Sequence, residues 1–169
     1  VEGREKACFG VTETKTGLNT TQLKTRAVRK GDKYIVNGQK VWISTAQVAH
    51  KILLLARTTP LEEVKNPTHG LSLFYADFNR DQIAVHEIEK MGRKAIDSNE
   101  LFISDFEIPV EDRIGEEGRG FEYILHGMNP ERVLIAAEAV GLGKLALDRA
   151  AAYAKQRIVF NRPIGQNQA

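Results

Sequence analysis

An aromatic ring and a hydroxyl stand two positions apart within residues 32–44 of the chain. Trp42, the only tryptophan, is followed by Ile43 and Ser44. Because side chains alternate between the two faces of a strand, Trp42 and Ser44 project to the same side if this stretch is extended. A wide aromatic surface beside a hydroxyl suits a flat ligand with a polar edge. The spacing alone favours another interpretation, in which Trp42 is a core residue and Ser44 ends the strand.

Glu131 and Arg132 form a second candidate pair. They stand at a predicted helix start, where a carboxylate is a usual capping arrangement, and the functional alternative is a carboxylate base beside a cation. The single cysteine, Cys8, is interpreted as inert packing. The sequence lacks the phosphate loops, zinc-binding helices and nucleophile elbows of common enzymes. Its histidines, at positions 50, 69, 86 and 126, are scattered through unlike elements, so no metal site is predicted.

The composition is that of a globular chain. Hydrophobic residues make up 42% and charged residues 27% of the 169 residues, which excludes a disordered chain. The net charge of +2 is too even to indicate nucleic acid or an anionic membrane as partner, and no apolar run reaches membrane-spanning length. One cysteine indicates a reducing compartment, the cytoplasm or, in a eukaryote, the mitochondrial matrix. Because the first residue is not Met, we expect a piece of a longer protein.

Strands are predicted along the first two thirds of the chain. Asn37-Gly38 lies between two runs of β-forming residues and predicts a two-residue hairpin turn. Further strands are predicted over residues 9–13, 20–30, 50–58, 70–78, 82–89 and 99–108. No helical pattern separates them, so the sequence predicts an antiparallel sandwich or barrel over residues 1–112.

The remaining residues are predicted to be a linker and a helix. Residues 113–120 are charged and rich in glycine, as in a domain linker, and the helical pattern begins at Phe121. Asn129-Pro130 is a favourable helix start, and nothing after it breaks the helix before Gln156. The helix is apolar around most of its circumference, so it must be buried on most sides. We therefore expect partner helices from the rest of the polypeptide or from another subunit.

Several segments recur together in one order in a known family. They are FGVTE at 9–13, GDKYIVNGQKVWIST at 31–45, KMG at 90–92, FEIPVEDRIGEEGRGF at 106–121, ERVLIAAEAVGLGKLALDRAAAYAKQRIVF at 131–160 and the closing PIGQNQA. On these motifs the chain resembles the acyl-CoA dehydrogenase family over nearly its whole length. The resemblance implies the middle β-barrel or sandwich domain over residues 1–112, followed by the first long helix of an incomplete C-terminal four-helix bundle over residues 121–169.

The resemblance implies FAD as cofactor and a set of residues that bind it. Those expected to line the flavin are Phe9, Val11, Thr12, Trp42, Ile43 and Ser44. Thr12 would bind the pyrimidine edge of the ring, and Ser44 would donate a hydrogen bond near N5, the atom that receives hydride. Gly17 matches a family glycine in the turn that follows. Arg157 and Phe160 match residues at the pyrophosphate and adenine of a neighbouring subunit's FAD, and Gln168 matches another FAD contact.

The resemblance also implies an acyl-CoA substrate. Leu18 replaces the family serine that contacts phosphate or the CoA chain, which leaves only its backbone as a contact. Met128, Asn129 and Arg132 match residues near the thioester and pantetheine. The implied reaction is α,β-dehydrogenation, in which a carboxylate removes the α-proton and the β-hydride passes to the flavin. The carboxylate lies on a later helix in most subfamilies and at the position of Glu131 in a minority, and both stay open.

The resemblance further implies partners, and it leaves alternatives. The FAD contacts across subunits imply a homodimer or homotetramer, and an electron-transfer flavoprotein is the implied electron acceptor. The same fold also serves oxygen-using chemistry, as in acyl-CoA oxidases, nitroalkane oxidases and flavin monooxygenases. A third possibility is a β-domain without enzymatic activity that uses its long helix for assembly. Uptake of FAD and the rate at which oxygen reoxidises the reduced flavin distinguish these functions.

Overall fold

The computed structural model describes residues 2–167. The chain divides into two compact units, one that ends at Leu125 and one that begins at His126. The first unit contains a sheet with the following strands: β1 (Ala7–Gly10), β2 (Arg26–Lys30), β3 (Lys33–Ser44), β4 (Lys51–Arg57), β5 (Leu71–Asp77), β6 (Ile83–Glu87), β7 (Ser98–Pro109) and β8 (Arg113–Ile114). The second unit contains most of helix α1 (Gly120–Gln156) and a short pair, β9 (Ile158–Val159) and β10 (Arg162–Pro163).

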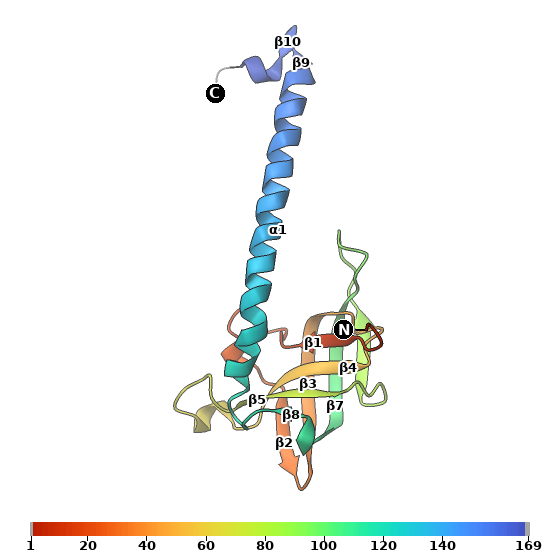
Figure 1. The fold of residues 1–169 in the computed structure, drawn as a ribbon, viewed down its shortest axis with the longest axis vertical. Helices are drawn as coiled ribbons and strands as arrows, with labels where there is room; N and C mark the ends of the chain where they lie inside the picture. Colours follow the sequence, from red (N-terminus) through yellow and green to blue (C-terminus); the bar gives the residue numbers. More distant parts are fainter. Residues whose placement is uncertain (1, 168–169) are drawn as a thin grey trace. The chain divides into compact units, whose positions relative to one another are not determined.

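Most neighbouring strands of this sheet are antiparallel. Its order is β6-β7-β3-β2-β4-β5-β8, and β1 pairs with β4 (Figure 1). The β1–β4 and β2–β4 pairs are parallel. Within the described residues the path of paired strands ends at β6 and at β8 without closing, so the sheet folds over its core as a sandwich. The predicted mainly β fold with one long helix is confirmed, in the sandwich form.

The core lies between the folded parts of the sheet. Strand β4 is buried along most of its length, as its continuous apolar run predicts. Fully buried side chains from β3, β4, β5 and β7 form one cluster, which includes Tyr34, Ile52, Phe74 and Phe106. Tyr34 and Phe74 meet edge to face with ring centroids 4.9 Å apart. This packed core supports β1 and β3, and it thereby holds the residues on their outward faces in place.

The predicted hairpin turn at Asn37-Gly38 is wrong. Strand β3 runs through both residues, and the turn lies six positions earlier, at Gly31-Asp32. There Lys30 pairs with Lys33, and Gly31 adopts a φ of 65°, which glycine accepts at little cost.

Asn37 and Gly38 mark a bulge and a close approach instead of a turn. The register between β3 and β7 shifts between Val36 and Gly38. A Cβ atom on Gly38 would lie 2.7 Å from Cα of Thr25, so only glycine fits. The Asn37 side chain donates to Oδ1 of Asp105 at 3.0 Å and accepts from its backbone N–H at 2.9 Å. An Asn-Gly pair is therefore explained here by tertiary contacts.

The predicted helix start at Asn129 is wrong, because helix α1 begins earlier in the chain. It runs from Gly120 and carries Pro130 inside it. The missing Pro130 N–H removes one hydrogen bond from a helix about 55 Å long, and the good helix formers Glu131, Arg132 and Leu134 follow it. Gly120 is buried against β5, where an added Cβ would meet the Leu73 backbone nitrogen at 2.4 Å. Contact with the sheet thus fixes the first turn.

Large apolar side chains of α1 are exposed along its length. The exposed fractions of Val133, Leu134 and Leu147 are 69%, 69% and 70%. Among the described residues of α1, only Gly120 and Ile124 are buried. A helix apolar on all sides is stable when other elements cover it. No helix in the described part of the chain is long and apolar enough to cross a membrane.

Candidate functional site

The Trp42 ring lies on the surface of the sheet. Its side chain is 59% exposed, Ile43 is buried and Ser44 is exposed, so Trp42 and Ser44 share an outward face. The core interpretation of Trp42 is therefore wrong. The backbone of Trp42 has a φ of 62°, and the register between β3 and β7 shifts between Lys40 and Ile43. This β-bulge turns the large Trp42 side chain outward, although the residues on either side of it in β3 are buried.

The segment around Thr12 lies beside this bulge. The backbone N–H of Val41 donates to the carbonyl oxygen of Thr12 at 2.9 Å, which joins the two predicted flavin-lining segments. Phe9 on β1 is 37% exposed and Thr12 is half-buried. Val11 is buried in the core at 4% exposure, so it contributes backbone only to this surface, as does the buried Ile43. The two segments therefore carry two exposed aromatic rings, Phe9 and Trp42, and two hydroxyls, those of Thr12 and Ser44.

A buried ion pair lies beneath the Thr12 segment. Lys40 is fully buried, and its Nζ donates to the carbonyl oxygens of Val11 at 3.0 Å and Leu55 at 2.8 Å, and to Oε1 of Glu13 at 2.9 Å. These bonds hold the residues on both sides of Thr12. Burial lowers the pKa of Lys40 to about 8, against the charge of Glu13, so the amine is protonated at neutral pH.

The carboxylate of Glu13, the other partner of this ion pair, also accepts backbone hydrogen bonds. Its Oε2 accepts the backbone N–H of Lys24 at 2.7 Å, and its Oε1 accepts that of Thr25 at 2.9 Å. Burial would raise the pKa of Glu13, but the charge of Lys40 and these hydrogen bonds outweigh it, and the pKa lies below its usual value. Both partners are therefore charged at neutral pH.

Two polar side chains of β7 and the loop before it hold the turn that follows Ser44. Asp97 accepts the backbone N–H groups of Thr45 at 3.1 Å and Gln47 at 3.2 Å. Asn99, which is fully buried, donates to the carbonyl oxygen of Ile43 at 2.8 Å. Hydrogen bonds to Asp97 and Asn99 thus hold the Trp42–Ser44 segment, in addition to the hydrogen bond at Thr12.

Residues predicted to contact CoA or FAD in the turn after Thr12 are exposed. Leu18 is 101% exposed, and Gly17 has no atom within 4 Å of the position of an added Cβ. The backbone N–H of Thr16 donates to the carbonyl oxygen of Glu13 at 3.1 Å, which ties this turn to the buried ion pair.

The other predicted site residues lie in the second unit. On α1, Met128 is half-buried, and Asn129, Glu131 and Arg132 are exposed, with Nη1 of Arg132 donating to Oδ1 of Asn129 at 2.6 Å. Arg157 and Phe160 follow the end of α1, and Phe160 is 92% exposed with a φ of 52°. Gln168 lies outside the described residues.

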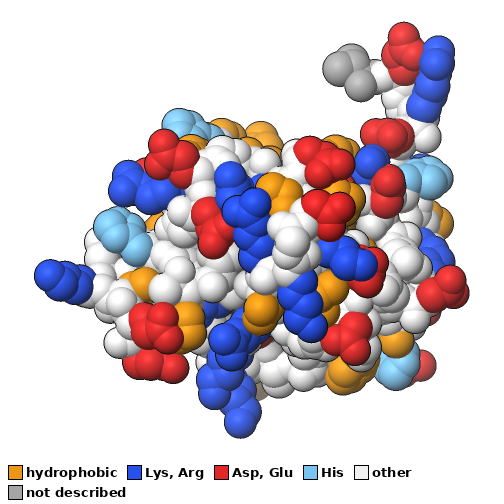
Figure 2. All heavy atoms as spheres, turned by 90° about the horizontal axis from the view of Figure 1, so that it is seen from below, with side chains coloured by type: hydrophobic (Ala, Val, Ile, Leu, Met, Phe, Trp, Pro, Cys, Tyr) orange, Lys and Arg blue, Asp and Glu red, His pale blue; other side chains and the backbone are white. Residues whose placement is uncertain are grey.

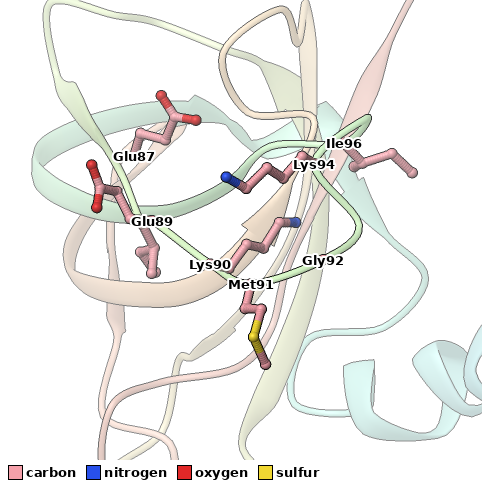
Figure 3. A pocket seen from close by; sticks show the side chains of 8 residues that line it. Glu87, Glu89, Lys90, Met91, Gly92, Lys94 and Ile96 are labelled. Carbon is pink, nitrogen blue, oxygen red and sulfur yellow. The ribbon is translucent and has the colours of Figure 1, made fainter.

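An open cavity of about 650 Å³ lies on the loop between β6 and β7. Figure 3 shows Glu87 and Glu89 near each other and Met91 pointing away from them. None of the predicted site residues lines this cavity, which is lined by Glu87, Ile88, Glu89, Lys90, Met91, Gly92, Lys94 and Ile96. Side chains of both charges and no converging buried group give it no evident ligand chemistry.

Sequence reasoning missed the buried polar residues that support the surface. A signal existed for Lys40, because alternation from Tyr34 and Val36 assigns it to the inward face of β3, where an unpaired lysine is not tolerated. Asp97 carried no signal, since it lies in a glycine-containing loop and the backbone groups that it accepts, at Thr45 and Gln47, are far away in sequence.

Known proteins resemble this chain over nearly all of its length. The model "Acyl-CoA dehydrogenase, middle domain" matches residues 8–106, and "Acyl-CoA dehydrogenase, C-terminal domain" matches residues 118–169. A cyclohex-1-ene-1-carbonyl-CoA dehydrogenase of Syntrophus aciditrophicus is 38% identical over 92% of this chain and 37% of its own length.

Solved structures agree with these matches. An acyl-CoA dehydrogenase from Geobacillus kaustophilus superposes with a TM-score of 0.84 at 32% identity, over 96% of this chain and 42% of that one. A glutaryl-CoA dehydrogenase from Mycobacterium smegmatis, solved in complex with FADH2, superposes with a TM-score of 0.80 at 28% identity, over 97% of this chain and 40% of that one.

The chain spans less than half the length of these relatives, at 37% to 43% for the first three curated ones. The two matched family models nevertheless follow each other in the order of the sheet and the helix. Together with the agreement in structure, these matches mean that the chain belongs to the acyl-CoA dehydrogenase family.

Proposed function

We propose that the chain is part of a longer polypeptide that catalyses FAD-dependent α,β-dehydrogenation of an acyl-CoA thioester. The single observation that carries this proposal is the outward-facing Trp42 beside Ser44, joined through Val41 to the backbone of Thr12. A bulge that exposes a tryptophan on an otherwise packed strand costs stability, and a ligand that covers the ring explains it.

These residues fit a flavin. The exposed rings of Trp42 and Phe9 offer apolar surface for a flat ring system, and hydroxyls at its edge can donate hydrogen bonds. Thr12 would bind the pyrimidine edge and Ser44 would donate near N5. FAD, when bound, would accept the hydride that leaves the β-carbon of the acyl chain. Donors at the ring edge stabilise the negative charge that the reduced flavin gains.

The substrate would lie against residues of α1. Met128, Asn129 and Arg132 would contact the thioester and pantetheine, and Leu18 would offer its backbone to the CoA chain. Glu131 is one candidate for the base that removes the α-proton, and a carboxylate on a later helix is the other. Glu131 is exposed and lies in the interior of α1, so the capping role expected at a helix start does not apply to it.

We further propose the assembly. The sheet domain would extend to residue 112, residues 113–120 would join it to the helical domain, and further helices would cover the apolar sides of α1. Arg157, Phe160, Gly17 and Gln168 would contact FAD, the first two in a neighbouring subunit of a homodimer or homotetramer. An electron-transfer flavoprotein would accept the electrons, in the cytoplasm or in a mitochondrial matrix.

The test uses the full-length polypeptide that contains these residues. It should purify with a flavin absorbance band that bleaches when acyl-CoA thioesters are added without oxygen. Trp42→Ala should weaken FAD binding about threefold to tenfold, as loss of an aromatic contact predicts. Phe102→Ala, which removes a ring of 38% exposure from β7, should leave FAD binding unchanged.

The alternatives give different results. A colourless protein that takes up no added FAD would contradict the proposal and favour an assembly domain. Reduced flavin that oxygen reoxidises within the turnover time would favour an oxidase or monooxygenase. Equal losses in Trp42→Ala and Phe102→Ala would mean that the flavin lies elsewhere.

A further inference from the structure

The turn that follows Ser44 has an unusual backbone. Thr45 adopts a φ of 67°, in the left-handed region that β-branched residues rarely occupy. One side chain compensates for it: Asp97 accepts the N–H of Thr45 at 3.1 Å through Oδ1, and the N–H of Gln47 at 3.2 Å through Oδ2. One carboxylate therefore fixes both ends of the turn.

Asn99 also holds the end of strand β3 by hydrogen bonds. Its Nδ2 donates to the carbonyl oxygen of Ile43 at 2.8 Å and to Oδ2 of Asp97 at 2.6 Å, and its Oδ1 accepts from Nε2 of Gln47 at 3.2 Å. Asn99 is fully buried, so it has no water to replace these partners. The backbone is thus held at the residue before Ser44 and at the residue after it.

Arg80 holds the same turn from its carbonyl side. Its Nη2 donates to the carbonyl oxygens of Ala46 at 3.2 Å, Gln47 at 3.0 Å and Ala49 at 3.1 Å. With N–H groups directed to Asp97 and carbonyls directed to Arg80, the turn is fixed by charged groups on both sides.

A carboxylate is required at position 97. Three donors converge on its two oxygens, whereas an asparagine offers one oxygen and would direct an N–H₂ group toward a donor. Burial would raise the pKa of Asp97, but the donors from Asn99, Gln47 and Thr45 lower it below its usual value, so the group is ionised at neutral pH.

We propose that Asp97 is a positioning residue for the flavin site. It holds the left-handed backbone at Thr45 and thereby sets the direction of the Ser44 hydroxyl. This inference rests on the proposed function. Asp97 does not contact the cofactor; it acts through the backbone that carries Ser44, and through Asn99 on the carbonyl of Ile43.

The test compares two Asp→Asn variants in the full-length polypeptide. Asp97→Asn should raise the Kd for FAD about tenfold, the loss of one charge-assisted hydrogen bond. It should also make the flavin reduction potential more negative, because a displaced Ser44 no longer stabilises the reduced ring. Asp105→Asn is the matched control, since Asp105 lies on β7, the strand that follows Asp97, and accepts a hydrogen bond from Asn37. Its Kd and potential should equal those of the unmodified protein.

A second variant separates positioning from simple destabilisation. Thr45→Gly accepts a φ of 67° without strain, so Asp97→Asn combined with Thr45→Gly should recover part of the lost FAD affinity and, if Asp97→Asn fails to fold, restore folding. Equal Kd and potential in Asp97→Asn and Asp105→Asn would overturn the inference, as would a double variant no better than Asp97→Asn. If the unmodified protein binds no FAD, it is the proposed function that fails.

Discussion

At the scale of single residues, buried charge determines how the proposed flavin surface is held. The Lys40–Glu13 pair lies beneath Thr12, and the sequence indicates only its lysine, through its inward position on β3. Its value for stability is asymmetric: the intact pair contributes little, but one partner left alone is a buried unpaired charge.

Removal of one partner should therefore be costly. Lys40→Met should destabilise the protein by about 3–5 kcal/mol, because Glu13 is left buried without its cation. The matched control is Lys33→Met, which breaks the exposed pair with Glu107 and should cost less than about 1 kcal/mol. Urea unfolding measures both. Equal costs would mean that burial of the pair is not what matters, and adding Glu13→Gln to Lys40→Met should recover part of the loss.

The same pair predicts a dependence on pH. The folded pKa of Lys40 is lowered by burial to about 8 from the ordinary 10.5, so the unfolded chain binds more protons between these values. This group therefore makes stability rise with pH from about 8 to 10.5. The pKa of Glu13 is lowered from 4.5, so its contribution is present above pH 4.5 and is lost as pH falls through the lower folded value. NMR titration of the Lys40 side chain should give a midpoint near 8, and an ordinary midpoint would contradict this.

At the scale of elements, β3 shows what sequence reasoning could and could not establish. Strand positions on β4 and β5 followed from apolar runs, because burial of a strand is recorded in its own residues. Asn37-Gly38 carries a strong local turn signal that does not apply here, because the reason for Gly38 is its contact with the Thr25 backbone, which is remote in sequence. The exposed face of Trp42 likewise depends on a bulge against β7. Family resemblance, not spacing, makes Trp42 a candidate site residue.

The close approach at Gly38 gives a third prediction. Gly38→Ala should destabilise the protein by about 1–3 kcal/mol, since the added Cβ would lie 2.7 Å from Cα of Thr25 and the chain at Thr25 must move. Gly17→Ala is the control, because nothing lies within 4 Å of its added Cβ, and it should change stability by less than about 0.5 kcal/mol. Thermal unfolding of the two variants decides, and a Gly38→Ala variant as stable as the control would disprove the contact.

At the scale of the whole molecule, the distribution of charge and the exposed apolar surface lead to different conclusions about partners. Figure 2 shows acidic and basic side chains interspersed over one face, in keeping with the net charge of +2, and this mixture favours no polyanionic partner. The apolar sides of α1 are a different matter, because Val133, Leu134 and Leu147 are each about 70% exposed. Such surface is stable when covered.

We therefore expect the 169-residue chain alone to bind FAD weakly and to have no dehydrogenase activity. Part of the proposed site and the cover of α1 would come from residues outside it. Titration of the purified chain with FAD, followed by fluorescence, should give a Kd at least about a hundredfold above that of the full-length polypeptide, in line with the loss of two or more contacts. Turnover of an acyl-CoA by the chain alone would refute this expectation.

The attachment of the segment after β7 to the sheet has a consequence for protein engineering. The hydroxyl of the fully buried Tyr34 contacts Glu117 and Arg113, and the N–H of Gly118 donates to Oγ of Ser72 at 2.9 Å. A chimera that exchanges helical domains with a homologue at residue 112 would replace Arg113, Glu117 and Gly118, the hydrogen-bond partners of Tyr34 and Ser72. A crossover placed beyond Leu125 keeps them, so shuffled family members joined there should express as folded protein more often.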